Sequence, residues 1–269
     1  MLESSYQRLI KYLVSKNFNL NNIDIIISKI SFISDIDIRY AINNIEYLEE
    51  LGIKDEELEK VIKSFPYILT MKIGEFIRIR TFLNEFGYDD EKIKRLIVRY
   101  PELLCIDINI LKSKILEITR IGYSREDIIK MTTVSPNILG ISIEKMNDKI
   151  NNLKDLGYSL HEVIKITTYF PSIFCFSKES IREKIEYLKS IGLSSVVVNR
   201  PKCLIQGVEL TYARYRFFKT IGKKINERSC ADLFISKKDF LYRYDISNGE
   251  LFHLYPYKSN IKKLNKINL

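Results

Sequence analysis

The sequence is organised as a repeat of 35 residues, and this regularity limits the folds that the chain can adopt. Glycine recurs with this spacing at five positions, and a proline follows four of these glycines after 14 residues. The glycines are Gly52, Gly87, Gly122, Gly157 and Gly192, and the prolines are Pro66, Pro101, Pro136 and Pro171. A fixed period of this length is typical of a solenoid, in which each unit buries its apolar face only against its neighbours.

Each repeat predicts two helices and a short third turn. The glycine allows the first helix to end in the left-handed conformation. Two residues later stand Asp89, Ser124 and Ser159, which we expect to cap the second helix, with capping boxes between Ser124 and Asp127 and between Ser159 and Glu162. Apolar residues then recur at helical spacing until the proline ends the helix. The apolar pair after each proline predicts a short turn of 3₁₀ type that plugs the core.

Both ends of the array depart from the repeat, as terminal units do. Asn17 stands where the first glycine would be, Ser31 stands where its proline would be, and Pro201 follows Gly192 by only nine residues, which predicts a shortened second helix. We therefore predict one repeat domain over residues 1–245, with a degenerate unit at 6–38, full repeats at about 39–191, a shortened unit at 192–206 and a C-terminal cap at 207–245. In this cap, ADLFISKKDFLYRYDI suggests a terminal helix pair. Residues 246–269 are expected to form a basic tail that ends in the frayed segment KSNIKKLNKINL.

The net charge of +9 is concentrated at one end of the chain. Residues 1–191 carry 28 basic and 28 acidic side chains, whereas residues 192–269 carry 15 basic and 6 acidic ones. This distribution predicts a polyanionic partner for the C-terminal part, with nucleic acid first and an anionic membrane surface second. The alternative is a solvated basic tail without a partner.

Several classes of protein are excluded by what the sequence lacks. No apolar run approaches the roughly 20 residues of a membrane-spanning helix. The cysteines are too far apart for a zinc site or a disulfide framework, and Cys105 and Cys175 lie in apolar runs that predict buried thiols. The first residues resemble neither a secretory signal nor a transit peptide.

The sequence contains no motif that indicates a catalytic site. Neither His161 nor His253 has a cysteine or aspartate partner at motif spacing, and the glycine-rich and nucleophile motifs of nucleotide-binding enzymes and hydrolases are absent. We expect a protein that is not an enzyme and that needs no cofactor and no metal.

The repeat resembles that of the mitochondrial transcription termination factor family, mTERF, over about residues 12–245. The resemblance rests on the units YLEELGIKDEELEKVIKSFPYIL, FLNEFGYDDEKIKRLIVRYPELL, EITRIGYSREDIIKMTTVSPNIL and NLKDLGYSLHEVIKITTYFPSIF. It implies an all-α, left-handed superhelical α-solenoid that binds nucleic acid in its concave groove. It also implies a mitochondrial or plastid location, although no transit peptide is evident; the alternative is the cytoplasm of an AT-rich bacterium.

Two columns of basic residues follow the repeat. Eight residues before the glycines, including Gly222, stand Asn44, Ile79, Lys114, Lys149, Lys184 and Arg214; eight residues after them stand Lys60, Arg95, Lys130 and Lys165. Donors repeated along a surface suit the phosphates of a duplex, so we expect each column to form a stripe that contacts the nucleic-acid backbone. The alternative is that both columns are ordinary solvated helix faces, as the acidic neighbours Glu59, Glu91, Glu117 and Glu183 would indicate.

The C-terminal part adds a basic cluster with interleaved aromatic residues. The cluster comprises Arg200, Lys202, Arg214, Arg216, Lys219, Lys223 and Lys224, and the aromatic residues are Tyr212, Tyr215, Phe217 and Phe218. Arginine and lysine neutralise phosphates, and exposed aromatic rings stack on unpaired bases. Phe217 and Phe218 occupy the positions of Tyr187 and Leu188 in the preceding unit, so we expect them in the core, with Arg214, Arg216 and Lys219 on the surface.

These observations favour a nucleic-acid-binding helical-repeat protein that regulates transcription, for example by termination. Double-stranded DNA is the preferred partner and RNA the second. Two alternatives remain open: a protein-binding α-solenoid scaffold, and an RNA-binding factor for organellar RNA processing or ribosome assembly. We expect a monomer with no membrane partner.

Overall fold

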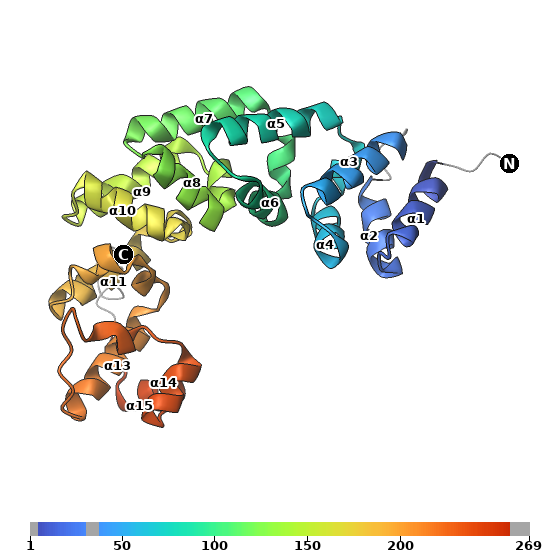
Figure 1. Ribbon diagram of the computed structural model, residues 1–269. Helices are drawn as coiled ribbons and strands as arrows, with labels where there is room; N and C mark the ends of the chain where they lie inside the picture. The colour runs from blue at the N-terminus through green and yellow to red at the C-terminus, as the bar shows by residue number, and fades with distance from the viewer. Residues whose placement is uncertain (1–4, 31–37, 259–269) are drawn as a thin grey trace, which may run out of the picture. The chain divides into compact units, whose positions relative to one another are not determined.

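Every regular element in the described residues, 5–30 and 38–258 of this computed structural model, is helical (Figure 1). The elements are fifteen α-helices, α1–α15, and six short 3₁₀ helices, η1–η6. The prediction of an all-α repeat fold is confirmed. The chain forms two compact units, Met1–Ile143 (unit 1) and Glu144–Leu269 (unit 2).

Unit 1 stacks its helices in two layers. First helices pack on first helices, α1 on α3, α3 on α5 and α5 on α7, while second helices pack in the series α2, α4, α6 and α8 (Figure 1). The elements are α1 (Ser5–Ser15), α2 (Leu20–Ile30), α3 (Ile38–Glu50), α4 (Asp55–Ser64), η1 (Pro66–Thr70), α5 (Ile73–Phe86), α6 (Asp90–Arg99), η2 (Pro101–Cys105), α7 (Ile108–Ile121), α8 (Arg125–Val134) and η3 (Pro136–Gly140).

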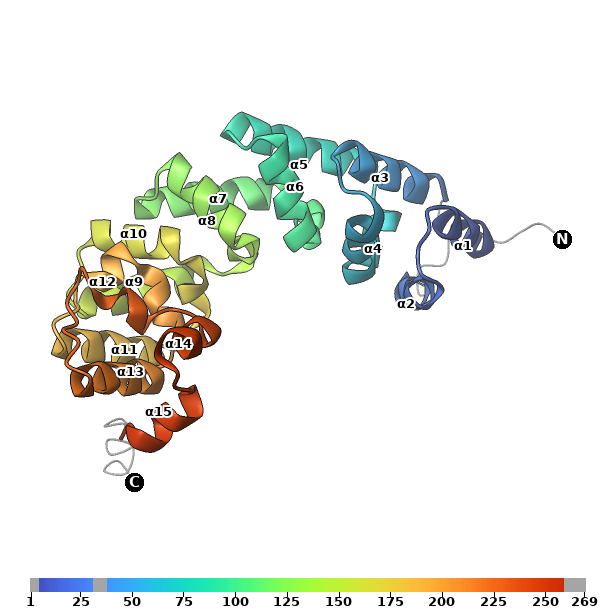
Figure 2. The ribbon, with the colours of Figure 1, turned by 60° about the horizontal axis from the view of Figure 1, so that its bottom comes forward.

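Unit 2 repeats this layering, with α10 against α12 and α11 alongside α13 (Figure 2). In the repeat that contains Gly192, the second helix α12 has only four residues, as the early Pro201 predicts. The elements are α9 (Ile143–Asp155, which begins at the last residue of unit 1), α10 (Leu160–Tyr169), η4 (Pro171–Cys175), α11 (Lys178–Ser190), α12 (Val196–Asn199), η5 (Pro201–Ile205), α13 (Val208–Thr220), η6 (Cys230–Leu233), α14 (Lys237–Tyr244) and α15 (Asn248–Leu254).

The local signals act as predicted. Gly87 ends α5 at φ 103° and Gly122 ends α7 at φ 118°, a backbone region that side chains with a Cβ rarely occupy. Asn17 adopts the same left-handed conformation at φ 62°, whereas Ser31 lies outside the described residues. Asp89, Ser124 and Ser159 cap α6, α8 and α10, and both predicted capping boxes are present.

The prolines begin the 3₁₀ turns that plug the core. Each turn buries the apolar pair that follows its proline, Ile68–Leu69, Leu103–Leu104, Ile138–Leu139 and Ile173–Phe174. The prediction of buried thiols at Cys105 and Cys175 is wrong: both are exposed, because they occupy the outward-facing last position of η2 and η4. Cys203 and Cys230 are the buried cysteines.

The C-terminal end differs from the prediction. The stretch expected to form a helix pair is the 3₁₀ turn η6 followed by the single helix α14. A further helix, α15, lies within the residues assigned to the tail and begins with a capping box between Ser247 and Glu250. Of the segment expected to fray, residues 259–269 lie outside the described part. No helix in the described ranges is long and apolar enough to cross a membrane.

Candidate nucleic-acid interface

The first-helix column, eight residues before each glycine, is largely buried. Its members are Asn44, Ile79, Lys114, Lys149, Lys184 and Arg214. Asn44 and Arg214 are 0% exposed, Lys149 is 5% exposed, and Lys114 is half-buried. The prediction of a solvent-facing stripe is therefore wrong for this column, and Arg214 is not a surface residue.

The polar members of this column bind backbone carbonyls at the end of the next 3₁₀ turn. Lys149 Nζ donates to the Phe176 carbonyl at 2.5 Å, and Lys184 Nζ donates to the Leu204 carbonyl at 2.7 Å. The same role is played by Asn44 Nδ2 toward Ile68 (2.6 Å) and Met71 (2.9 Å), by Lys114 Nζ toward Ile141, and by Arg214 Nη1 toward Leu233 (3.0 Å) and Ile235 (2.8 Å). Carbonyls at a helix end lack intrahelical partners, so these side chains act as internal caps.

Burial of these cations changes their acid–base properties. Desolvation lowers the pKa of Lys114, Lys149 and Lys184, and it lowers the pKa of Arg214 to about 10. The carbonyl dipoles and neighbouring rings offset part of this cost: the Arg214 guanidinium lies 4.1 Å from the centroid of the Phe240 ring. These charges serve the fold and are not presented to a ligand.

The second-helix column, eight residues after each glycine, faces solvent more openly. Lys60, Arg95 and Lys130 of unit 1 are exposed, while Lys165 of unit 2 is half-buried and donates to Asn199 Oδ1 at 3.3 Å. Arg95 pairs with Glu91 one turn away, at 3.2 Å. Arg200 stands eight residues after Gly192, so it is the exposed fifth member of this column, a register that sequence reasoning missed.

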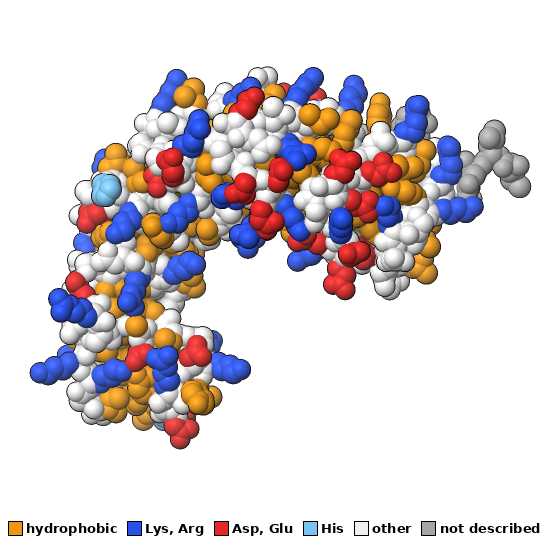
Figure 3. Space-filling view, viewed as in Figure 1, with side chains coloured by type: hydrophobic (Ala, Val, Ile, Leu, Met, Phe, Trp, Pro, Cys, Tyr) orange, Lys and Arg blue, Asp and Glu red, His pale blue; other side chains and the backbone are white. Residues whose placement is uncertain are grey.

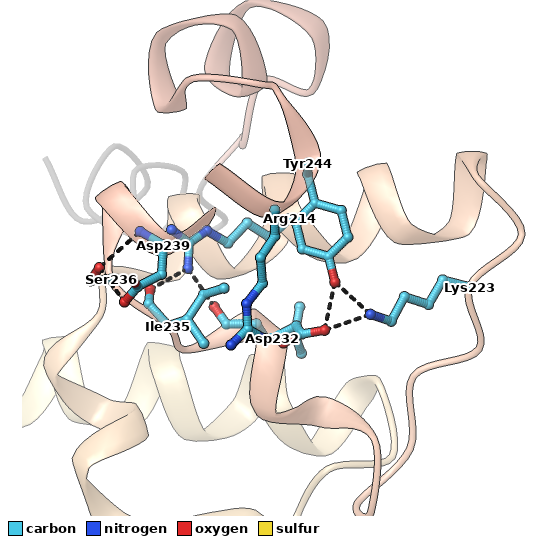
Figure 4. A network of polar contacts seen from close by, with 9 residues as sticks. Arg214, Lys223, Asp232, Ile235, Ser236, Asp239 and Tyr244 are labelled. Carbon is cyan, nitrogen blue, oxygen red and sulfur yellow. Dashed lines mark hydrogen bonds and ion pairs between the residues drawn. The ribbon is translucent and has the colours of Figure 1, made fainter. Parts of the chain in front are cut away.

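Lys223 belongs to the predicted basic cluster but is engaged inside unit 2 (Figure 4). Its Nζ lies 2.5 Å from Asp232 Oδ2 and 2.5 Å from the Tyr244 hydroxyl. Arg243 Nη1 completes the contacts at 2.6 Å from Asp232 Oδ1. The hydrogen bond from Lys223, followed by that from Tyr244, holds the pKa of Asp232 below its ordinary value. The network joins the segment after α13 to η6 and α14.

The rest of the cluster is exposed. The side chains of Arg200, Lys202, Arg216, Lys219 and Lys224 have no hydrogen bond or ion pair within the part of the chain that the structure describes. Arg216 and Lys219 are three residues apart on α13 and so share one face of that helix. Lys219, Lys223 and Lys224 line a surface hollow of about 410 Å³ together with Tyr215.

The aromatic residues of this region divide between core and surface hollow. Both rings contact Phe240 and Tyr244, but only Phe218 is fully buried, so the predicted core position is confirmed for Phe218. Phe217 is partly buried and lines a surface hollow, so its side chain lies at the edge of the core. Tyr215 is partly buried beside Lys219, whose Nζ lies 5.1 Å from the ring centroid.

The two units differ in charge. Residues 1–143 carry 20 basic and 21 acidic side chains, whereas residues 144–269 carry 23 basic and 13 acidic ones. On the visible face of unit 1 the two signs are interspersed, and on that of unit 2 lysine and arginine are the more prominent (Figure 3). Within the described ranges, no group of three or more histidine, cysteine or acidic side chains is placed to hold a metal ion.

Comparison with known families gives the same assignment as the repeat. The mTERF family model matches residues 1–242, which is nearly the whole chain. No protein with a curated description matches it. Members of this family are helical-repeat, nucleic-acid-binding proteins, generally non-enzymatic and typically organellar. From the repeat, the helical layers and this match together, the chain belongs to the mTERF family.

Proposed function

We propose that this protein binds double-stranded DNA through unit 2 and regulates transcription in an organelle, with termination as the specific activity. The observation that carries the proposal is the group of exposed cations without a carboxylate partner, Arg200, Lys202, Arg216, Lys219 and Lys224. Such side chains can exchange water and counterions for phosphate oxygens without breaking a contact of the fold. A protein held firmly on a duplex obstructs a polymerase, and this requires no catalytic residue.

The cations that are engaged within the fold are not proposed as phosphate contacts. Lys114, Lys149, Lys184 and Arg214 donate to backbone carbonyls, and Lys223 binds Asp232, so we assign none of them to DNA. In unit 1, the exposed second-helix residues Lys60, Arg95 and Lys130 provide additional contacts to the DNA phosphates. Contacts to the DNA backbone position the protein and contribute affinity, but they do not distinguish one base sequence from another.

Fluorescence anisotropy with labelled duplex DNA, single-stranded DNA and RNA, titrated in salt, tests this proposal. Each phosphate contact contributes about −0.9 to the slope of log K against log salt for B-form DNA. Replacing Arg216, Lys219 and Lys224 together by alanine should therefore make the slope shallower by about 3. The duplex should bind more tightly than either single strand.

A matched control separates this site from general charge. The triple alanine variant of Lys54, Lys72 and Arg120 removes three exposed cations from unit 1 and the same total charge. It should leave the slope nearly unchanged. Equal effects of the two triple variants would mean that binding follows net charge alone, and preference for RNA would reassign the partner to RNA.

A further inference from the structure

The chain turns back along α13 after α15. Helix α15 packs on α13, and the four residues Tyr255–Lys258, which we call the C-terminal strap, follow it. The Tyr255 hydroxyl donates to Thr220 Oγ1 at 3.0 Å, at the end of α13. The Tyr257 ring centroid lies 5.3 Å from that of Tyr212, eight residues before Thr220. The strap therefore runs in the direction opposite to α13.

Tyr257 fastens the strap across two first helices. Its ring centroid also lies 6.2 Å from that of Tyr187 on α11, and its hydroxyl donates to Glu183 Oε1 at 3.2 Å. The ring planes meet at 57° with Tyr212 and 73° with Tyr187, the inclined and edge-to-face arrangements of aromatic side chains that pack on one another. Burial, followed by the charge of Glu183, raises the pKa of Tyr257 to about 12. Tyr257 is thus a packed anchor, and it fixes the point from which the chain continues.

The strap passes the face of α13 that carries Arg216. Tyr212, Arg216 and Thr220 follow one another at intervals of four residues, so they lie on one face of the helix. The strap contacts the first and the last of these three, and Arg216 between them stays exposed. Arg216 is one of the cations assigned above to DNA. The exposed Lys258, at the end of the strap, is therefore held close to the proposed DNA contacts.

The sequence from the end of the strap onward is basic without any acidic residue. It contains four lysines, Lys258, Lys262, Lys263 and Lys266. A polypeptide spans at most about 3.6 Å per residue, so Lys266 stands within about 29 Å of Lys258. Helix α13, with 13 residues, is about 20 Å long. All four lysines can thus reach a duplex that is held against α13.

We propose that the C-terminal strap holds this basic end of the chain beside α13, so that its four lysines bind DNA phosphates next to those contacted by Arg216. The proposal rests on the DNA binding proposed above and extends it to residues outside the basic cluster. Once the cluster holds a duplex, binding by the anchored lysines is intramolecular, and their effective concentration depends on where the segment starts. Tyr257 is a positioning residue, because it acts on DNA only through the lysines that follow it.

Replacement of Lys262, Lys263 and Lys266 by alanine in the full chain tests the contacts. The salt dependence of duplex binding should become shallower by about 3, since each phosphate contact contributes about 0.9. The triple alanine variant of unit 1 described above removes the same charge and is the matched control. An unchanged slope would overturn the proposal. Tighter binding would also overturn it, because it would mean that these lysines are held by Glu183 and Glu186, which line a hollow beside Lys258.

Tyr257→Ala tests the anchor without changing the charge. It should weaken duplex binding at least about threefold in the parent chain and have little further effect in the triple lysine variant, because the anchor acts through those lysines. Tyr242→Ala, which truncates the 90% exposed tyrosine of α14, should leave the affinity unchanged. A Tyr257→Ala effect of equal size in both backgrounds would overturn the positioning role.

Two comparisons keep the outcomes separate. Tyr257→Phe retains the ring contacts and loses only the hydrogen bond to Glu183, so it remains informative if Tyr257→Ala perturbs the fold. Its smaller loss of affinity should likewise vanish in the triple lysine variant. If the variant of Arg216, Lys219 and Lys224 changes the salt slope and the variant of Lys262, Lys263 and Lys266 does not, the proposed DNA binding stands and this inference fails. If neither changes it, both fail.

Discussion

The two columns of basic residues share one period and one chemistry, yet they lie in opposite environments. In the first-helix column, Lys149 and Lys184 point into the protein and bind carbonyls at the ends of 3₁₀ turns. In the second-helix column, Lys60 and Arg95 face solvent. The repeat period therefore identifies equivalent positions, whereas the face of the helix on which a cation lies decides whether it stabilises the fold or is available to a polyanion.

Truncation of Arg214 should give the largest effect. Arg214→Ala removes the donor to the Leu233 and Ile235 carbonyls and leaves a cavity against Phe240. We expect the free energy of unfolding to fall by about 3 kcal/mol, measured by urea denaturation followed by far-UV circular dichroism. Arg216→Ala, two residues along the same helix and exposed, should change it by less than about 0.5 kcal/mol. Similar losses in both variants would remove the distinction between the columns.

A second pair of variants tests the donor alone. Lys184→Met keeps an apolar stem of similar length but deprives the Leu204 carbonyl of its hydrogen bond. The expected loss of unfolding free energy is about 1–2 kcal/mol, against less than about 0.5 kcal/mol for Lys60→Met on the exposed column. A Lys184→Met variant as stable as the parent would show that the buried amine is not needed as a cap.

The buried lysines also predict a dependence of stability on pH. Because the pKa of Lys184 is lower in the folded chain than its ordinary 10.5, the unfolded chain binds more protons in the interval between the two values. Stability contributed by this residue therefore rises with pH across that interval. The difference in unfolding free energy between the parent chain and Lys184→Met should grow as the pH rises toward 10.5. A difference that is constant over this range would contradict the lowered pKa.

The dependence of stability on pH that Tyr88 of unit 1 contributes has the opposite sign. Burial raises its pKa to about 12, and its hydroxyl lies 2.6 Å from Thr132 Oγ1. Its contribution to stability is complete below pH 10 and is lost as the pH rises toward 12. Tyr88→Phe should flatten the fall in unfolding free energy above pH 10, and an unchanged pH profile would show that another tyrosine dominates.

The smallest effect concerns a single exposed cation. Lys60→Ala should make the salt dependence of duplex binding shallower by roughly 0.9, the value for one phosphate contact. Lys184→Met should leave that slope unchanged at temperatures where it is folded. A shallower slope in Lys184→Met, with none in Lys60→Ala, would reverse the assignment of the two columns.

Local chemistry explains why the repeat could be predicted from the sequence. The glycine stops, the caps at Ser124 and Ser159 and the 3₁₀ turns after proline each depend on a few neighbouring residues. The short helix α15 also carried a local signal, the capping-box pair of Ser247 and Glu250, although it was assigned to the tail.

Burial of the first-helix column depends on tertiary packing and could not be derived from neighbouring residues alone. A lysine eight residues before a glycine is polar in the sequence, and its carbonyl partners lie about 20 to 27 residues further along. One clue was present: Ile79 occupies the column, and an apolar side chain at an equivalent position indicates a buried face. Binding by the exposed residues depends on a partner molecule as well as on the fold, so their role stays a prediction.

The internal caps have a mechanical consequence. Each one joins the first helix of a repeat to the end of its own 3₁₀ turn, as Asn44 of α3 does with Ile68 and Met71 at η1. Polar contacts between neighbouring repeats are of two kinds: the Lys16–Glu49 pair is partly exposed and therefore weak, whereas the hydrogen bond between Tyr88 and Thr132 is buried. Through the internal cap, the first helix of a repeat and the 3₁₀ turn of the same repeat are coupled and should move as one body. A load applied to either of these two elements is then shared with the other through the cap.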